Sequence, residues 1–521
     1  MLSDLLIGDL LTDERKEKFR GGPIISKEKV LVIYTGGTIG SAPKDRDDPE
    51  SPEIVYSWDD LKKYIHALQR IQFLIDVISF VEPLDSANVE PKHWKAMAKI
   101  IENYYDDYNG FVIAHGTDTM VYTASALSFI LKNLGKPVII TGSQIPALDK
   151  LRNDAEQNLI TALYIAQYEY MSIPKVPEVC IFFRDLLIRG NRSKKFDASG
   201  YDAFKSLNYV PLGICGDRIS IKKDVLNEIP EADFHIQPEL TTDVISIDLT
   251  PGMQNNENLC KNLFTPKENQ PKGIVLKTYG AGNVPTNENF LNIIGDAIKN
   301  GAIVINVTQC PKGEVQQGLY DTSAVLQDIG VISGQDITYE AAMCKLMNVL
   351  GEEDFTIEQK KELIATNMAG EQAFSMYTTI IDDKEQSINS AKAAETRYRS
   401  PAIKINGYTD KKNNIEKILI RFIGAKISDG EKLKILVFIN LPAIIAKDTE
   451  KVPKSESTST HAGTFLKSRD SEDKPQTFTF DLKKARTELK SSSTITVYAI
   501  SDGDECATLS WDRIELTLFC K

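Results

Sequence analysis

Three side chains that can do acyl chemistry stand on glycine-rich turns in the first quarter of the chain. Thr38 lies in the segment TGGTIGS, residues 35–41, and the neighbours Thr117 and Asp118 lie in HGTDTM, residues 115–120. A threonine hydroxyl becomes a nucleophile toward a carbonyl carbon when a nearby base takes its proton, and a carboxylate can orient that base. These residue types therefore suggest acyl transfer or hydrolysis through a threonine nucleophile.

Each motif follows an apolar run that is typical of a buried parallel strand. Residues 30–33 (VLVI) precede the first motif, and residues 110–114 (GFVIA) precede the second. Such strands are apolar on both faces because helices cover both sides of a parallel sheet. Ligands bind to open parallel sheets in the crevice at the carboxyl ends of the strands. We therefore expect Thr38, Thr117 and Asp118 to meet at one edge of the sheet.

Non-catalytic interpretations of both motifs remain open on the residues alone. Thr38 can belong to a glycine-rich turn that only starts a helix. A phosphate cradle is a weaker alternative, because the GxxxxGK[ST] spacing is absent and no lysine follows the glycines. Thr117 and Asp118 can serve as N-caps of the helix that follows, since both residue types are favoured there. Capping and catalysis do not exclude each other.

The group that would activate a threonine is not obvious, because the chain has only 5 histidines. His115 is the histidine that lies within a motif, and no GxSxG segment suggests a serine hydrolase. A lysine whose pKa is lowered by burial can act as the base instead. The basic segment RGNRSKK, residues 189–195, offers two lysines, although such a segment by itself is more typical of a solvated loop.

Strand-like and helical segments alternate from residue 29 to residue 217, as in βαβ units. Right-handed crossovers between them would give a doubly wound α/β sheet. The first predicted helix should end at Gly135, since Pro137 prevents its continuation. The predicted elements are helices 121–134 and 154–168 and strands 137–140 and 179–183.

The rest of the chain divides into a second α/β region and a region of different character. Residues 434–440, 476–480, 494–498 and 513–518 alternate apolar and polar side chains, which predicts an all-β, sandwich-like module. In the second α/β region we expect strands 244–247, 273–276 and 302–306 and helices 288–300 and 340–350. The predicted divisions are an N-terminal extension (1–28), a first α/β domain (29–217), a linker (218–242), a smaller α/β domain (243–372), a linker (373–400) and the β module (401–521).

Composition excludes several classes of protein. The 521 residues carry a net charge of −12, which argues against general nucleic-acid binding. No stretch approaches the roughly 18 apolar residues of a membrane span, and the N-terminal residues lack the order of a secretory signal. The 7 cysteines are dispersed without CxxC pairs, which favours reduced thiols and a cytoplasmic location.

Five motifs in this order make a more specific pattern than any one of them. They are TGGTIGS (35–41), HGTDTM (115–120), TGSQIP (141–146), RGNRSKK (189–195) followed by YDAFKSLNYVPLG (201–213), and YGAGNVP (279–285). The pattern resembles the bacterial-type L-asparaginase family, and its cytoplasmic type I branch in particular, over about residues 29–372. The resemblance implies a flavodoxin-like N-terminal domain and a smaller C-terminal α/β domain, in agreement with the element pattern.

The resemblance also implies a reaction and its residues. Thr38 would be the first nucleophile, and L-asparagine would be converted to L-aspartate and ammonia through an acyl-threonine ester. Thr117, Asp118 and Lys195 would form a second triad that activates a hydroxyl or a water molecule. Counting back from the YDAF segment favours Lys195 over Lys194. This chemistry needs neither a metal nor an organic cofactor.

Substrate contacts follow from the resemblance as well. Asp118 is suited to the α-ammonium of a free amino acid, and the segment Asp85-Ser86-Ala87 resembles the part of the family that binds the α-carboxylate. Many members have serine at the position of Ala87, so side-chain selectivity can differ here. Asn283 resembles a residue that reaches the active site of a neighbouring subunit, which implies a homodimer or homotetramer.

Other functions stay open at this level. The chain could act as a glutaminase, because one methylene changes discrimination by only about 1–3 kcal/mol. It also resembles a tRNA-dependent amidotransferase-type amidase, although that family adds its extra domain at the N-terminus. A third possibility is a binding protein that acts through its C-terminal β domain.

The family's mobile lid often carries a tyrosine, whereas residues 42–52 here are rich in proline and acidic residues without one.

Overall fold

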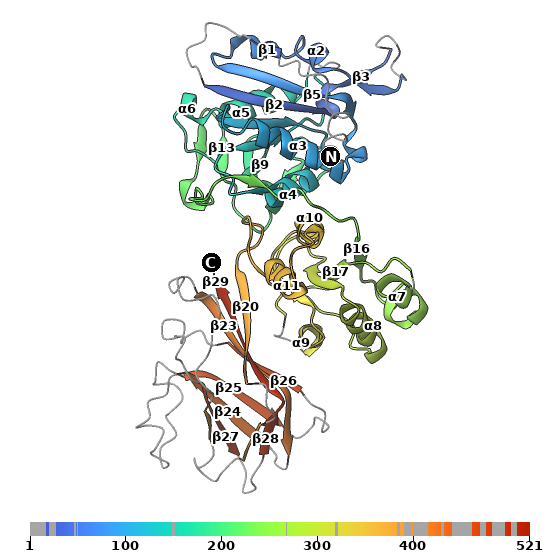
Figure 1. Cartoon of the computed structure of the whole chain (residues 1–521), viewed down its shortest axis with the longest axis vertical. Helices are drawn as coiled ribbons and strands as arrows, with labels where there is room; N and C mark the ends of the chain where they lie inside the picture. The colour runs from blue at the N-terminus through green and yellow to red at the C-terminus, as the bar shows by residue number, and fades with distance from the viewer. Residues whose placement is uncertain are drawn as a thin grey trace. The chain divides into compact units, whose positions relative to one another are not determined.

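The computed structural model (Figure 1) divides the chain into two compact units. The first contains residues up to 281 together with 299–315 and 334–372, and the second contains 282–298, 316–333 and the chain from 373 onward. The structure describes residues 17–19, 28–45, 48, 51–147, 152–266, 268–317, 321–382, 386–389, 397–399, 415–428, 432–439, 461–468, 476–481, 495–501 and 508–520.

A nine-stranded sheet forms the centre of the first unit. Strands β5, β2, β6, β8 and β9 are neighbours in that order and pair in parallel, as the apolar runs predict. Antiparallel strands β1, β10, β13 and β14 extend the sheet at its two sides. The strands are β1 (Glu17–Phe19), β2 (Lys29–Gly36), β5 (Leu74–Leu84), β6 (Gly110–Ala114), β8 (Val138–Thr141), β9 (Val179–Phe183), β10 (Leu186–Arg189), β13 (Gly213–Cys215) and β14 (Ile219–Ile221).

Helices cover both faces of this sheet, which confirms the doubly wound α/β prediction. Val30, Val32 and Val112 pack with residues of helix α5 (Ala155–Ala166) in one buried cluster. The intervening residues Leu31 and Ile33 are also fully buried. Helix α4 (Met120–Ile130) contacts β8 and β9 and packs beside α3 (Pro91–Asn103). The central strands are thus buried on two sides, so their polar residues concentrate at the strand ends.

Helix α4 ends earlier than the sequence predicts. The helix stops at Ile130, and Leu131–Lys132 instead forms the short strand β7, which pairs with β15 (His235–Ile236). The residue with positive φ in this region is Asn133 (φ 54°) rather than a glycine. Predicting the helix to Gly135 was wrong because a long-range strand pairing competes with the helical pattern.

Residues 218–242 also contain regular structure where a linker was expected. Strand β14 lies at the edge of the nine-stranded sheet, and β15 pairs with β7. The first α/β domain therefore uses this segment to complete its own edges.

A second parallel sheet in the first unit confirms the other predicted α/β strands. Strands β16 (Val244–Asp248), β17 (Gly273–Thr278) and β18 (Ile303–Thr308) pair in that order. Helix α10 (Tyr339–Gly351) packs on β16 and β17 and also contacts α4, so it joins the two sheets of this unit. Helix α11 (Ile357–Ala365) follows it and packs against it.

The second unit is mainly antiparallel β structure, with helices α8 (Glu288–Lys299) and α9 (Asp321–Asp328). One sheet has the order β20-β29-β23-β28-β21, with β26 also paired to β23, and the other has the order β22-β27-β24-β25. The strands are β20 (Ser375–Asp382), β21 (Gln386–Asn389), β22 (Arg397–Arg399), β23 (Ile415–Ser428), β24 (Lys432–Ile439), β25 (His461–Ser468), β26 (Gln476–Asp481), β27 (Ile495–Ser501), β28 (Thr508–Trp511) and β29 (Arg513–Cys520).

This β structure begins before the predicted boundary at residue 401. Strands β20, β21 and β22 all lie within the segment 373–400, which the sequence suggests is a linker. They pair with β29, β28 and β27, respectively. The segment is therefore part of the β sheets of the second unit. Over the part of the chain that the structure describes, no helix is long and apolar enough to cross a membrane.

Candidate active site

The loops that carry Thr38 and Thr117 touch each other through their backbones. Strands β2 and β6 are parallel neighbours, so the loops that follow them leave the same edge of the sheet. Gly37 has φ 85°, and a Cβ added to it would lie 2.3 Å from the Cα of Gly116. Only glycine fits this approach, because a side chain would overlap the neighbouring backbone. The predicted meeting of the two motifs at one sheet edge is therefore present.

Lys195 joins this group from a distant part of the sequence. Its Nζ lies 2.9 Å from Oγ1 of Thr117 and 2.6 Å from Oδ1 of Asp118. The lysine belongs to the short strand β11 (Lys194–Lys195), which pairs with β12 (Phe204–Lys205). The neighbouring Lys194 instead lies 3.9 Å from Glu340. Of the two candidate lysines, the structure brings Lys195 to the threonine and the aspartate.

Neither Thr117 nor Asp118 caps helix α4 with its side chain. Thr119 directly precedes α4, and no side-chain hydrogen bond caps this helix. Thr117 is buried, whereas the side chain of Asp118 is 63% exposed. An exposed carboxylate that already pairs with Lys195 has lone pairs left for a cationic ligand group.

The basic segment before Lys195 is buried, so its interpretation as a solvated loop is wrong. Arg189 forms a two-point ion pair with Glu178, at 2.5 and 3.0 Å. Asn191 donates to the carbonyl of Ala369 at 2.9 Å, and Arg192 donates to that of Gly370 at 3.0 Å. These contacts fix the backbone that leads to the lysine.

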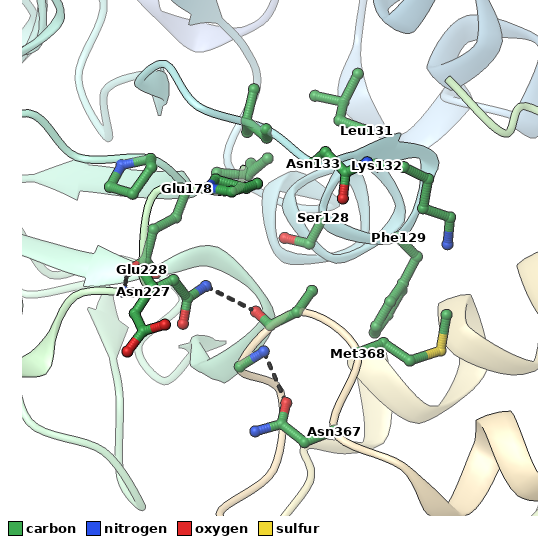
Figure 2. Close-up of a pocket in the computed structure, with 16 residues that line it drawn as sticks. Ser128, Phe129, Leu131, Lys132, Asn133, Glu178, Asn227, Glu228, Asn367 and Met368 are labelled. Atoms are coloured by element: carbon green, nitrogen blue, oxygen red, sulfur yellow. Dashed lines mark hydrogen bonds between the residues drawn. The ribbon is translucent and has the colours of Figure 1, made fainter. Parts of the chain in front are cut away.

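The loop that accepts these bonds, residues 366–372, is itself held by a buried ion pair. Lys345 and Glu371 are both 0% exposed, and their charged atoms lie 2.7 Å apart. Glu371 also accepts from the N–H groups of Met368 and Ala369. Figure 2 shows part of this loop, with the bond from Asn227 to Ala369 and the bond within the loop from Gly370 to Asn367.

A cavity of about 500 Å³ beside this loop contains none of the predicted catalytic residues. Figure 2 shows Ser128 and Phe129 at the end of α4 facing Glu178, Asn227 and Met368 across it. Helix α4 begins next to the Thr117 loop and ends at the cavity, so the two sites lie at opposite ends of one helix. Lys132 also lines the cavity, and burial lowers its pKa to about 8. The catalytic prediction and the cavity are separate features of the first unit.

The segment predicted to bind the α-carboxylate lies against the same loops. Ser86 is buried, and its Oγ accepts from the Asp118 N–H at 3.2 Å. The Ser86 carbonyl accepts from the Thr119 hydroxyl at 2.7 Å. Asp85 and Ala87 are exposed, and the Asp85 carboxylate accepts from the Ala87 N–H. The structure thus brings Ser86 to the catalytic loops and leaves its two neighbours at the surface.

The predictions for Asn283 and for the lid segment 42–52 have different outcomes. Asn283 belongs to the second unit, in the segment between β17 and α8, so its role at a neighbouring subunit's site stays a prediction. The lid segment 42–52 lies partly outside the described residues. Its ends form a hairpin of β3 (Ser41–Pro43) and β4 (Glu53–Val55). The Tyr56 hydroxyl donates to the Pro43 carbonyl at this hairpin, a contact that the sequence did not indicate.

His115 lies behind the Thr117 loop, and substrate could not reach its side chain. Its side chain is fully buried, and burial lowers its pKa to about 4. Its two ring nitrogens contact the Gly116 carbonyl oxygen at 2.7 Å and the Thr123 hydroxyl at 2.9 Å. A histidine without a free nitrogen cannot act as the base for a threonine, which is consistent with a lysine in that role.

Comparison with known proteins agrees with this fold. Residues 29–227 match the family model "Asparaginase, N-terminal", and residues 243–364 match "Glutaminase/Asparaginase C-terminal domain". Both α/β domains therefore have the architecture of amide-hydrolysing enzymes of this type. The chain belongs to the asparaginase family, as the motifs predict.

Three relatives illustrate the similarity. L-asparaginase 1 of Escherichia coli is 39% identical over 67% of this chain and 98% of its own length. The 60 kDa lysophospholipase of Homo sapiens is 34% identical over 66% of this chain and 61% of its own length. The crystal structure of L-asparaginase I from Vibrio cholerae is 36% identical, with a TM-score of 0.58 over 67% of this chain and 100% of that one.

Proposed function

We propose that this chain hydrolyses L-asparagine to L-aspartate and ammonia. The observation that supports this most is the contact of Lys195 with both Thr117 and Asp118, beside the loop of Thr38, in a member of the asparaginase family. The E. coli relative, almost all of which aligns with this chain, is itself named for asparagine. That name favours the asparagine reaction over the alternatives.

In the proposed reaction the Thr38 hydroxyl attacks the side-chain amide carbon of the substrate. The hydroxyl proton is taken up by the enzyme and passes to the amide nitrogen, the carbon–nitrogen bond breaks, and ammonia leaves. The product is an ester between Thr38 and the aspartyl group. Water then attacks the ester carbon, and the threonine oxygen leaves with a proton as aspartate is released.

Thr117, Lys195 and Asp118 supply the proton transfers in this proposal. The lysine amine accepts a proton through the Thr117 hydroxyl, at 2.9 Å, and the aspartate stabilises the resulting ammonium at 2.6 Å. Both distances are within hydrogen-bond range, so no rearrangement of these three side chains is needed. The proposed chemistry uses no metal or organic cofactor.

Substrate recognition would use the same edge of the sheet. The exposed carboxylate of Asp118 would bind the α-ammonium, and the Asp85–Ala87 segment would bind the α-carboxylate. Ser86 connects the two, because its Oγ accepts from the Asp118 N–H. Asn283 would complete the site of a neighbouring subunit in a homodimer or homotetramer.

The experiment is ammonia release by the purified chain over a series of L-asparagine and L-glutamine concentrations. Turnover of asparagine with a larger kcat/KM than glutamine supports the proposal, and the reverse order favours a glutaminase. Ammonia delivered only in the presence of a tRNA-dependent partner subunit would support the amidotransferase alternative. Specific binding by the β domain, with no amide turnover, would support the binding-protein alternative.

The human relative gives a reason to test one ester substrate in the same assay. It is named as a lysophospholipase, and an acyl-threonine ester can in principle form from either an amide or an ester. Fatty-acid release from a lysophospholipid, abolished by Thr38→Ala, would establish a second activity.

For cellular location we propose the cytoplasm, supported by five cysteines that are all free in the described part of the chain.

A further inference from the structure

A chain of hydrogen bonds runs behind the Thr117 loop through buried side chains. Nε1 of Trp94, on α3, lies 2.9 Å from Oγ1 of Thr123, on α4. The same Oγ1 lies 2.9 Å from Nε2 of His115. Nδ1 of His115 lies 2.7 Å from the carbonyl oxygen of Gly116. The chain of bonds thus links two helices to the peptide that immediately precedes Thr117.

Donor and acceptor chemistry, together with a neutral imidazole ring, fixes the direction of every bond in this series of hydrogen bonds. The Trp94 indole can only donate, and the Gly116 carbonyl can only accept. Nδ1 of His115 therefore carries the proton, and Nε2 accepts from the Thr123 hydroxyl. Burial lowers the pKa of His115 to about 4, so the ring is neutral near pH 7. The histidine is held in one tautomer and has no nitrogen left for proton transfer with substrate.

These hydrogen bonds bear on catalysis because of the peptide group to which the accepting carbonyl belongs. The Gly116 carbonyl and the Thr117 N–H belong to the same peptide group. A hydrogen bond to the oxygen of an amide polarises the group and strengthens the donor at its nitrogen. Among the described residues the Thr117 N–H has no hydrogen-bond acceptor. The N–H of Gly37, which lies against Gly116, already donates to the Leu84 carbonyl.

We propose that His115 is a positioning residue for the reaction. Its Nδ1–H holds and polarises the Gly116–Thr117 peptide, so that the Thr117 N–H donates to the oxyanion that forms when Thr38 attacks the substrate. His115 touches neither substrate nor water in this role. The inference rests on the proposed function, because it assigns an oxyanion donor to that reaction.

Two substitutions test the contacts of the two ring nitrogens of His115 separately. In His115→Asn the side-chain amide nitrogen takes the place of Nδ1 and keeps the bond to Gly116. In His115→Gln the amide group takes the place of Nε2, so the contact with Thr123 is kept and the bond to Gly116 is lost. The matched pair therefore tests the Nδ1 contact while the size and polarity of the side chain stay similar.

The measurements are kcat and KM for asparagine, with thermal unfolding of each variant. Loss of an oxyanion donor costs about 100- to 1,000-fold in kcat, so a misplaced donor should cost roughly tenfold or more. We expect that loss in His115→Gln, with KM nearly unchanged, and a kcat close to wild type in His115→Asn. Thr123→Val, which leaves Nε2 without its donor, should lower kcat by a smaller factor.

Several results would overturn the inference. One is an unchanged kcat in a folded His115→Gln variant. Another is an equal loss in both variants that follows their unfolding temperatures. If His115→Gln does not fold, an unchanged kcat in Thr123→Val overturns the inference instead. Wild-type protein that releases no ammonia from asparagine would refute the proposed function, whereas wild-type turnover with an unaffected glutamine variant refutes only the role of His115.

Discussion

The two units of this chain use charged side chains in different ways. In the first unit, parallel strands deliver Thr117, Asp118 and the loop of Thr38 to one sheet edge, where Lys195 meets them. In the second unit, Arg421 on β23 lies directly opposite Glu515 on the antiparallel strand β29 and forms an ion pair of 3.0 Å.

The difference follows from sheet geometry. Parallel strands are joined by crossovers, so loops that are far apart in the sequence meet at a common edge and leave polar groups open to a ligand. Antiparallel neighbours place side chains opposite each other within the sheet. Arg421 is 1% exposed and also pairs with Asp328 of α9 at 2.5 Å, so its charge is paired with carboxylates of the second unit. In our account Asp118 and Lys195 of the first unit serve chemistry, whereas the Arg421 cluster serves cohesion, as the buried pair of Lys345 and Glu371 does in the first unit.

After the loss of Thr38 itself, the largest effect should come from removing the second threonine. Thr117→Ala deletes the hydroxyl between Lys195 and the reacting groups, and we expect kcat for asparagine to fall by about a thousandfold or more. Thr250→Ala, at an exposed turn of the same unit, is the matched control and should keep wild-type activity. Near-normal ammonia release by a folded Thr117→Ala variant would remove the second triad from the mechanism.

The two adjacent lysines provide a sharper comparison. Lys195→Met should lower kcat by about 100-fold or more, since proton transfer by a positioned side chain contributes about 10² to 10⁴. Lys194→Met should have little effect, because Lys194 lies near Glu340 and not near Thr117. Steady-state kinetics of both variants decide the point. Equal losses would mean that the segment 189–195 has a structural role rather than a catalytic lysine.

The cohesive role of Arg421 predicts a loss of stability without a loss of chemistry. Arg421→Met removes the buried partner that Glu515 and Asp328 share, while Arg513 still contacts Glu515 at 2.9 Å, and it should destabilise the second unit by about 3 kcal/mol. Lys426→Met, at an exposed position of the same strand, is the control and should change little. Calorimetry should show the loss for Arg421→Met, while kcat stays within about twofold. A large fall in kcat at unchanged stability would contradict the division of roles.

The buried histidine of the first unit predicts a pH dependence of stability. Burial lowers the pKa of His115 from 6.5 to about 4, so the unfolded chain binds more protons between these values. Stability from this group is complete above pH 6.5 and is lost as the pH falls toward 4, by up to about 3 kcal/mol. His93, whose pKa is also lowered by burial, adds to the wild-type slope. Urea denaturation from pH 7 to pH 4 should therefore show a shallower decline in His115→Asn than in wild type, and parallel curves would refute the assignment.

Local patterns in the sequence predicted the parallel strands, whereas the four catalytic candidates were assigned through the resemblance to the asparaginase family, and their roles stay predictions. The apolar runs before Thr38 and Thr117 became the adjacent strands β2 and β6. Long-range pairings were not predictable in the same way. The end of α4 depends on β15, about a hundred residues away, and Arg192 bonds to Gly370 across 178 positions. Neither partner has a local signature, because each is an ordinary residue until the fold brings it to the other.

The buried hydrogen bonds of His115 illustrate the same limit. The sequence places this histidine within a motif, where a catalytic base is the natural expectation. Only the positions of Thr123 and the Gly116 carbonyl show that both ring nitrogens are occupied. Whether a polar side chain performs chemistry or supports it depends on which of its atoms remain free, and that is a property of the fold.

Formation of the acyl ester by Thr38 is tested by ammonia release from L-asparagine by wild type, Thr38→Ala and Thr38→Ser at neutral pH. We expect turnover by wild type, none above background in a folded Thr38→Ala variant, and partial activity in Thr38→Ser, which keeps a hydroxyl. Thr38→Ala that releases ammonia at a rate close to wild type would show that another group is the nucleophile.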